Sequence, residues 1–229
     1  MSTIILTGAN GNLGPTVARR LLKDGYRIIA TIGSHGSGEL TEGHMFEIKQ
    51  VDLMNGSQTR EFIKSVINQY PDLQAAVLLV GGFAMGNLSE ISEEMLNKMI
   101  RLNFLTAFNM VRNLLPFFLD RPEGGQFVLM GSRPGLNPKQ GKNFFGYTIS
   151  KSMVFSLADI INTEGKDKNV SATVIVPSII DTKENRQNMP EADFSNWVPA
   201  DVVADTISFT LSETGRMMRE TVIKIYNKS

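Results

Sequence analysis

The chain contains no cysteine, two histidines and one tryptophan among its 229 residues. Without cysteine there is no disulfide and no thiolate chemistry, and His35 and His44 are too few for a histidine-rich site, so we expect no bound metal. A charge imbalance is also missing, because 23 basic residues balance 23 acidic ones. A neutral chain lacks the basic footprint of a nucleic-acid binder, and we expect no nucleic-acid partner.

Long apolar runs are equally scarce. No run approaches the roughly 20 residues that a helix needs to cross a bilayer, and Ile4-Ile5-Leu6 is far shorter than the apolar core of a signal peptide. We therefore expect a cytoplasmic protein without a membrane partner. With 42% hydrophobic and 20% charged residues, the chain can bury one core, and its length predicts a single α/β domain over residues 1–229.

The N-terminal segment has the pattern of a strand, a glycine loop, a helix and a second strand. Apolar residues 3–6 lead into the loop, a helical pattern follows as far as Asp24-Gly25, and residues 26–32 form the next apolar run. Glycines between a strand and a helix N-terminus let backbone amides approach a pyrophosphate, whereas a tight turn without a ligand is the alternative. The candidate cofactor-binding residues of this loop are Gly8, Asn10, Gly11, Asn12, Leu13 and Gly14.

Tyr147 and Lys151 stand four residues apart at the start of a second helix-periodic segment. Residues at this spacing share a helix face, so both side chains can point into one cleft. A fixed cation near a phenol favours the phenolate and lowers the phenol pKa from its usual value of about 10. A tyrosine tuned in this way can exchange a proton with an alcohol or carbonyl oxygen, although a solvated pair without chemistry has the same spacing.

Further motifs occur in one consistent order along the chain. The glycine loop opens with Thr7-Gly8, Asn103 follows Gly82 by 21 residues, Ser132 precedes Tyr147 by 15, and Pro177 follows Tyr147 by 30. With these motifs the chain resembles the short-chain dehydrogenase/reductase family over essentially its whole length. The resemblance implies a Rossmann-type, doubly wound parallel sheet of about seven strands in three α/β/α layers.

The resemblance also implies an enzyme that transfers a hydride reversibly between a nicotinamide cofactor and a small-molecule carbonyl or alcohol. Tyr147 would be its general acid and base, and Ser132 would hold the substrate oxygen. Lys151 would lower the pKa of Tyr147 and bind ribose hydroxyls, and Asn103 would hold a water that relays protons to Lys151. These four residues are the candidate catalytic set.

The same resemblance assigns further cofactor contacts. Asp52 and Leu53 would lie beside the adenine, with a helix cap as the alternative role of Asp52; the remaining candidates are Gly81, Gly82, Pro177, Ile180, Thr182, Tyr147 and Lys151. The second strand ends without an acidic residue before Glu39, and Ser34 and His35 could donate hydrogen bonds to a 2′-phosphate. We therefore expect NADP(H) in preference to NAD(H).

Two departures from the family pattern keep other functions open. Asn12 stands at the middle glycine, which gives a Gly-x-x-Gly-x-x-Gly spacing, and Leu79-Val80 replace two asparagines. A non-catalytic nucleotide-binding redox sensor or regulator, and an epimerase or dehydratase on the same fold, are the alternative functions.

The other expectations concern the surroundings of the site. Residues 183–198 form a substrate lid or a long surface connection, and Phe144-Phe145 line the substrate pocket. Helices over residues 92–119 and 147–164 carry more apolar residues than one packed face requires, which predicts a homodimer or homotetramer.

Overall fold

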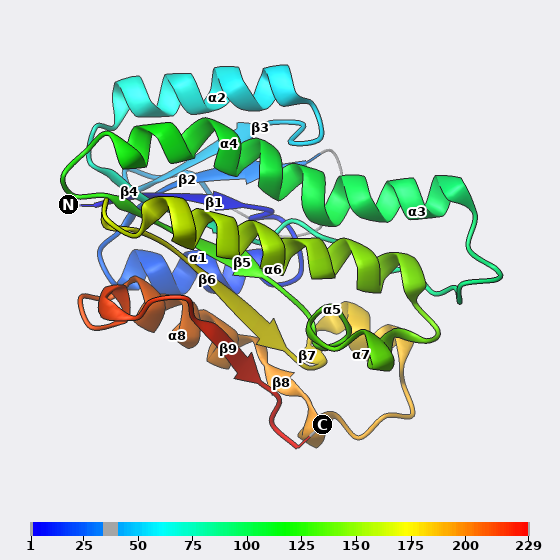
Figure 1. Ribbon diagram of the computed structural model, residues 1–229. Coiled ribbons are helices and arrows are strands. Elements are labelled where there is room, and N and C mark those ends of the chain that lie inside the picture. The colour runs from blue at the N-terminus through cyan, green and yellow to red at the C-terminus, as the bar shows by residue number, and fades with distance from the viewer. Residues whose placement is uncertain (1, 34–40, 229) are drawn as a thin grey trace.

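A parallel sheet forms the centre of the protein. The computed structural model describes residues 2–33 and 41–228, and within them seven strands pair in the order β3-β2-β1-β4-β5-β6-β9. Every pairing in this sheet is parallel (Figure 1). The order reverses between β1 and β4, so the carboxyl ends of these two strands flank the switch point where ligands bind in open α/β sheets. The predicted fold class and the strand number are confirmed.

The strands follow the apolar runs of the sequence. They are β1 (Thr3–Thr7), β2 (Arg27–Ile32), β3 (Phe46–Gln50), β4 (Leu73–Leu78), β5 (Gly125–Met130), β6 (Val170–Pro177) and β9 (Val222–Ile225). Successive side chains alternate between the two faces, so Ile5 packs in one core cluster while Ile4 and Leu6 pack in the other. Both faces of the inner strands are covered, which explains why these strands are mostly apolar, whereas the edge strands β3 and β9 are partly exposed.

Helices cover the two faces unequally. In Figure 1, α2 (Gly56–Gln69), α4 (Thr106–Leu119) and α6 (Phe145–Gly165) lie on one side of the sheet, and α1 (Gly14–Lys23) and α8 (Ala200–Leu211) lie on the other. Residues of the first three helices join the core cluster that contains Ile5, and residues of α1 and α8 join the cluster that contains Ile4. No helix of the described segments is long and apolar enough to cross a membrane.

The long helix expected over residues 92–119 is interrupted. It consists of α3 (Glu93–Ile100), a π-helical segment η1 (Arg101–Leu105) and α4. π-Helical turns occur frequently at functional sites. The segment contains the candidate catalytic residue Asn103, whose amide binds the backbone at the end of β4.

Short elements crowd the carboxyl edge of the sheet. The segment after β5 forms a short helix α5 (Arg133–Leu136) and a 3₁₀ turn η2 (Pro138–Gly141). The predicted lid region forms α7 (Lys183–Asn188) and a 3₁₀ turn η3 (Phe194–Asn196), and it ends in a strand β8 (Val198–Pro199) that pairs with β7 (Ile180–Asp181). Another 3₁₀ turn, η4 (Gly215–Met217), follows α8. Trp197 is buried within this region, so its C-terminal end is anchored in the protein.

Candidate active site

Tyr147 and Lys151 lie in the first two turns of α6. Lys151 is buried, and its Nζ donates a hydrogen bond of 2.8 Å to the carbonyl oxygen of Met130, the last residue of β5. Burial lowers the pKa of Lys151 to about 8, because the charged ammonium loses its hydration. This contact fixes the start of α6 against the carboxyl end of β5.

Ser132 follows β5 directly and links the phenol to the strand end. Its hydroxyl oxygen accepts a hydrogen bond of 3.1 Å from the backbone nitrogen of Gly135 and caps α5. The Ser132 side chain also forms a hydrogen bond with Tyr147, which opposes the larger rise that burial causes in the pKa of the phenol. Ser132 and Tyr147 are therefore close enough to act on one substrate oxygen.

The net effect on the pKa of Tyr147 differs from the sequence-based expectation. Burial raises this pKa, and the Ser132 hydrogen bond only opposes the rise. The expected lowering by Lys151 was wrong for the chain alone, because Lys151 directs its ammonium to the Met130 carbonyl and does not offset the effect of burial on the phenol. In this state Tyr147 is a protonated phenol, the form that can donate a proton.

Asn103 is almost completely engaged by hydrogen bonds. Its Nδ2 donates to the oxygen of Gly82 at 3.0 Å and to Oγ of Ser150 at 3.0 Å, and its Oδ1 accepts from the nitrogen of Gly82 at 2.8 Å. The amide of an asparagine has two donor hydrogens and two acceptor lone pairs, so one lone pair of Oδ1 remains for another partner. Asn103 thus fixes the backbone after β4 and keeps one acceptor position.

The two glycines after β4 give this arrangement its space. A Cβ on Gly82 would lie 2.5 Å from Cδ2 of Leu102, so a side chain there would push η1 away. A Cβ on Gly81 would lie 2.8 Å from Oδ1 of Asn103 and 3.2 Å from Nζ of Lys151. The bare backbone of Gly81 therefore leaves the space between these two polar atoms open.

The glycine loop between β1 and α1 is closely packed and leads directly into a helix N-terminus. Gly8 has a φ of +67°, and a Cβ on Gly14 would lie 2.3 Å from the oxygen of Ala9. The first turn of α1 has no acidic residue, and the N-cap residue Leu13 provides no side-chain hydrogen bond. Its backbone N–H groups can therefore bind a phosphate, so the loop fits the cofactor.

Two asparagines of the loop contact other segments. The amide of Asn10 donates to the oxygen of Gly33 at 3.5 Å, and the amide of Asn12 donates to the carboxylate of Glu184 in α7. The second contact joins the glycine loop to the predicted lid, 172 residues later in the chain. The sequence carried no signal for it. Gly11 closes the turn by donating to the oxygen of Gly8 at 3.0 Å.

The other candidate cofactor residues lie at the same edge of the sheet. Leu53 packs its side chain into the core, and the Asp52 carboxylate accepts a hydrogen bond of 2.9 Å from the nitrogen of Met54, as a turn residue does. Pro177 ends β6, Ile180 belongs to β7, and Thr182 caps α7 by accepting from the nitrogen of Asn185 at 3.2 Å. Ser34 and His35 fall outside the described residues.

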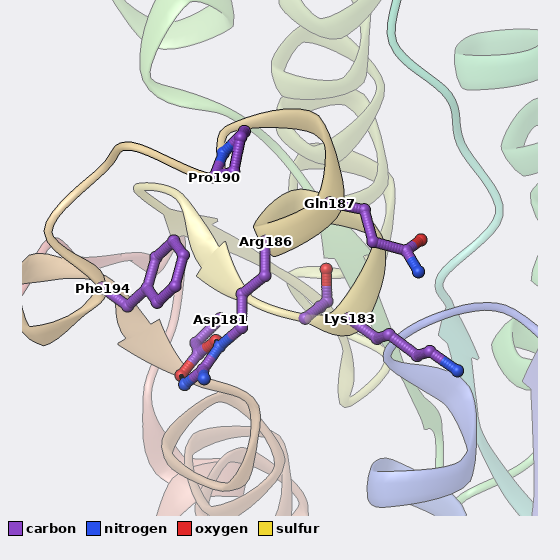
Figure 2. Close-up of a pocket in the computed structure, with 7 residues that line it drawn as sticks. Asp181, Lys183, Arg186, Gln187, Pro190 and Phe194 are labelled. Atoms are coloured by element: carbon purple, nitrogen blue, oxygen red, sulfur yellow. Dashed lines mark hydrogen bonds and ion pairs between the residues drawn. The ribbon is translucent and has the colours of Figure 1, made fainter.

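A cavity of about 630 Å³ lies in the lid region (Figure 2). Arg186 crosses it with two hydrogen bonds to Asp181, at 2.6 and 2.7 Å, and its guanidinium carbon lies 4.7 Å from the ring centroid of Phe194. Lys183 and Gln187 also line it and point away from the Asp181–Arg186 pair (Figure 2). No sequence motif predicted these contacts.

Comparison with known proteins agrees with this geometry. The sequence model of the family described as short chain dehydrogenase matches residues 2–193. The 3-oxoacyl-[acyl-carrier-protein] reductase MabA of Mycobacterium bovis is 26% identical over 232 residues, which cover 97% of this chain and 90% of that protein. The NADP-dependent 3-hydroxy acid dehydrogenase YdfG of Salmonella typhi is 27% identical over 181 residues, covering 77% of this chain and 72% of that protein.

Solved structures share the fold at lower identity. A structure described as ElxO with NADP bound superposes with a TM-score of 0.85 at 21% identity and covers 98% of this chain and 96% of that chain. A crystal structure of gox2181 gives a TM-score of 0.85 at 20% identity, with 98% and 93% of the two chains covered. These proteins therefore share the fold of this chain.

Proposed function

Because the chain belongs to the short chain dehydrogenase family of NAD(P)(H)-dependent oxidoreductases, we propose that it interconverts a small-molecule carbonyl compound and the corresponding alcohol. The observation that carries this proposal is the convergence of four side chains from three elements. Ser132 follows β5, Tyr147 and Lys151 begin α6, and Asn103 lies in η1. Hydrogen bonds link Ser132 to Tyr147, Lys151 to the end of β5, and Asn103 to Ser150.

The proton chemistry follows from the surroundings of Tyr147. Reduction of a carbonyl places negative charge on its oxygen, and a nearby acid must neutralise that charge. Tyr147 carries the proton because burial raises its pKa, and Ser132 lies beside it to hold the same oxygen. The nicotinamide cofactor supplies the hydride when bound, and the glycine loop between Gly8 and Gly14 would hold its pyrophosphate.

Proton resupply would use the space beside Gly81. The free lone pair of Asn103 Oδ1 and the ammonium of Lys151 flank this space, at 2.8 and 3.2 Å from the position of a Cβ on Gly81. One water there could accept from Lys151 and donate to Asn103. With a pKa of about 8, Lys151 can release and regain a proton near neutral pH.

The cofactor we favour is NADP(H). No acidic residue stands between the end of β2 and Glu39 to repel a 2′-phosphate, and one relative is named as NADP-dependent. Ser34 and His35 would donate hydrogen bonds to that phosphate, so the preference should sharpen as pH falls toward the histidine pKa of about 6.5. Tighter binding of NADH than of NADPH at both pH 6 and pH 8, in fluorescence titrations, would reverse the assignment.

We also propose that the protein is a homodimer or homotetramer. Ile160 on α6 is an exposed apolar side chain, and the stacked rings of Phe104 and Phe108 are only partly covered. A second copy packed against α4 and α6 would bury these groups. Sedimentation velocity at micromolar concentration tests this assembly, and a monomer would contradict it.

Turnover is the direct test of the proposed activity. The purified chain is mixed with NADPH or NADH and a panel of ketones, aldehydes and 3-oxo esters, and cofactor oxidation is followed by absorbance. We expect carbonyl-dependent oxidation with at least one class of compound. Tight dinucleotide binding without turnover of any carbonyl or alcohol would indicate a nucleotide-binding regulator instead.

A further inference from the structure

Phe83 lies directly against the candidate proton donor. Its ring centroid is 5.1 Å from that of Tyr147 at an interplanar angle of 71°, and 5.6 Å from that of Phe144. Phe83 is nevertheless 58% exposed, although a ring of this size is usually covered in a folded protein. Part of its aromatic surface is therefore available to a molecule that reaches the Tyr147 hydroxyl.

The backbone around Phe83 is held in place before any ligand binds. Gly86 donates from its nitrogen to the oxygen of Asn143 at 2.8 Å, and its own oxygen accepts from the nitrogen of Phe145 at 2.8 Å. Gly86 adopts a φ of +139°, which is strained for any residue with a side chain. Ile91 packs against Gly146, where a Cβ would lie 2.5 Å from its Cδ1. The loop and the start of α6 therefore form one preorganised wall.

This wall offers no charge to a substrate. The loop residues 79–89 and the facing residues 143–150 include no Asp, Glu, Lys, Arg or His. Met85 and Leu88 extend the apolar surface and are 65% and 70% exposed. A charged or heavily hydroxylated group placed here would lose hydration without gaining a partner, whereas an apolar group would gain contact area.

We propose that Phe83 determines substrate specificity and that the substrate is an uncharged carbonyl compound with an aromatic group beside its carbonyl. The substrate ring packs against Phe83 and Phe144, and the carbonyl oxygen reaches Tyr147 and Ser132. Edge-to-face and offset arrangements are the preferred geometries of aromatic pairs, and Phe83 already adopts one of them with Tyr147. This inference rests on the proposed function, because it names the substrate class of the same site.

The test compares two ketones that differ only in aromaticity. Acetophenone and cyclohexyl methyl ketone carry rings of equal carbon number, and KM and kcat are measured for both with the wild type, Phe83→Ala and Phe83→Leu. We expect the wild type to favour acetophenone, and both variants to raise its KM about 2- to 10-fold, the range expected for one lost aromatic pair, with kcat little changed. Phe83→Leu keeps apolar bulk and should leave the KM for the cyclohexyl ketone near the wild-type value.

Met217→Ala is the matched control. Met217 is also a large exposed apolar residue, 73% exposed, but it lines a separate cavity with Ser2 and Gln74. This variant should change neither KM. A wild-type preference for the cyclohexyl ketone, or equal KM values for acetophenone in the wild type and Phe83→Ala, would overturn the inference.

A binding measurement separates this inference from the proposed activity. Ligand-observed NMR reports contact of acetophenone with the protein whether or not turnover occurs. Binding that weakens in Phe83→Ala but not in Met217→Ala would support the aromatic subsite even if the chain reduced no ketone. Undetectable binding to the wild type in the presence of NADP⁺ would contradict the subsite even if another carbonyl were reduced.

Discussion

The floor and the rim of the candidate site are built by different interactions. The floor consists of Asn103, Ser132 and Lys151, which are all buried and all hydrogen-bonded to backbone atoms at the ends of β4 and β5 or in α5. The rim consists of the loop around Phe83 and of α7, where side chains are exposed. Buried polar groups are costly unless they are satisfied, so the floor is fixed in one arrangement. The side chains of the rim are not constrained in this way, so we expect the rim to distinguish one substrate from another.

The largest expected effect belongs to Tyr147, which contacts the floor through its hydrogen bond with Ser132. Tyr147→Phe removes only the phenolic hydroxyl, so kcat should fall by about 10² to 10⁴-fold, the usual contribution of a positioned acid. The affinity for the dinucleotide and the free energy of unfolding should change little, because the ring keeps its contacts with Phe83. Steady-state kinetics, cofactor titration and urea unfolding measure the three quantities.

Tyr26→Phe is the control for this variant. It also removes one phenol, which donates a hydrogen bond of 3.1 Å to the oxygen of Leu211 in α8. Its kcat should remain near the wild-type value. If Tyr147→Phe kept more than about half of the wild-type rate, the acid role of Tyr147 would be wrong.

The second prediction concerns how much the buried ammonium of Lys151 lowers the free energy of unfolding. Burial lowers the pKa of Lys151 from 10.5 to about 8, so between these two pH values the unfolded chain holds a proton that the folded chain has released. The free energy of unfolding therefore increases as pH rises from about 8 to 10.5. Below about pH 8 the folded protein is destabilised by the full cost of burying the charged ammonium. Lys151→Met abolishes turnover and removes this penalty.

Urea unfolding at a series of pH values between 7 and 10.5 measures the effect. We expect the stability of Lys151→Met relative to the wild type to fall by about 3 kcal/mol across the window, from 1.36 kcal/mol for each pKa unit. Loss of the hydrogen bond to Met130 lowers the stability of the variant by the same amount at every pH. The informative quantity is therefore how the stability difference between the variant and the wild type changes with pH. Lys139→Met, which replaces an exposed lysine in η2, is the control. A flat difference for Lys151→Met would show that Lys151 keeps its ordinary pKa.

The floor was largely predictable from the sequence, because motif spacing fixes which element ends meet. Parallel strands bring their carboxyl ends to one edge, so Gly82, Ser132 and the start of α6 had to converge there. Strand limits were less exact: β4 ends at Leu78, whereas the apolar run continues to Val80. Pairing with β5 also stops at Leu78, and the nitrogen of Leu79 instead donates to Oγ1 of Thr7.

The rim and the electrostatics were not predictable in this way. The shift in the pKa of Tyr147 depends on how deeply the phenol is buried, which spacing along one helix does not reveal. Contacts between Phe83 and Tyr147, and between Asn12 and Glu184, join segments whose distance depends on loop geometry. In the sequence, Phe83 follows the glycine pair Gly81-Gly82, but this position does not reveal its contact with Tyr147, and nothing in the sequence pointed to Glu184.

The smallest expected effect tests the rim where it meets the cofactor loop. The carboxylate of Glu184 accepts a hydrogen bond from Asn12, next to the uncapped N-terminus of α1 where a pyrophosphate would bind. Glu184→Gln keeps a hydrogen-bonding side chain but removes a negative charge that repels the phosphates. We expect NADPH to bind about 2- to 5-fold more tightly, as is typical of one exposed charge pair, and the gain to vanish at 1 M salt, where the Debye length is about 3 Å. Glu191→Gln, which also changes an exposed glutamate of the same region, should have no effect.

If both variants bind NADPH as the wild type does at low salt, Glu184 moves away from the glycine loop when the cofactor enters, and the contact with Asn12 has no influence on binding.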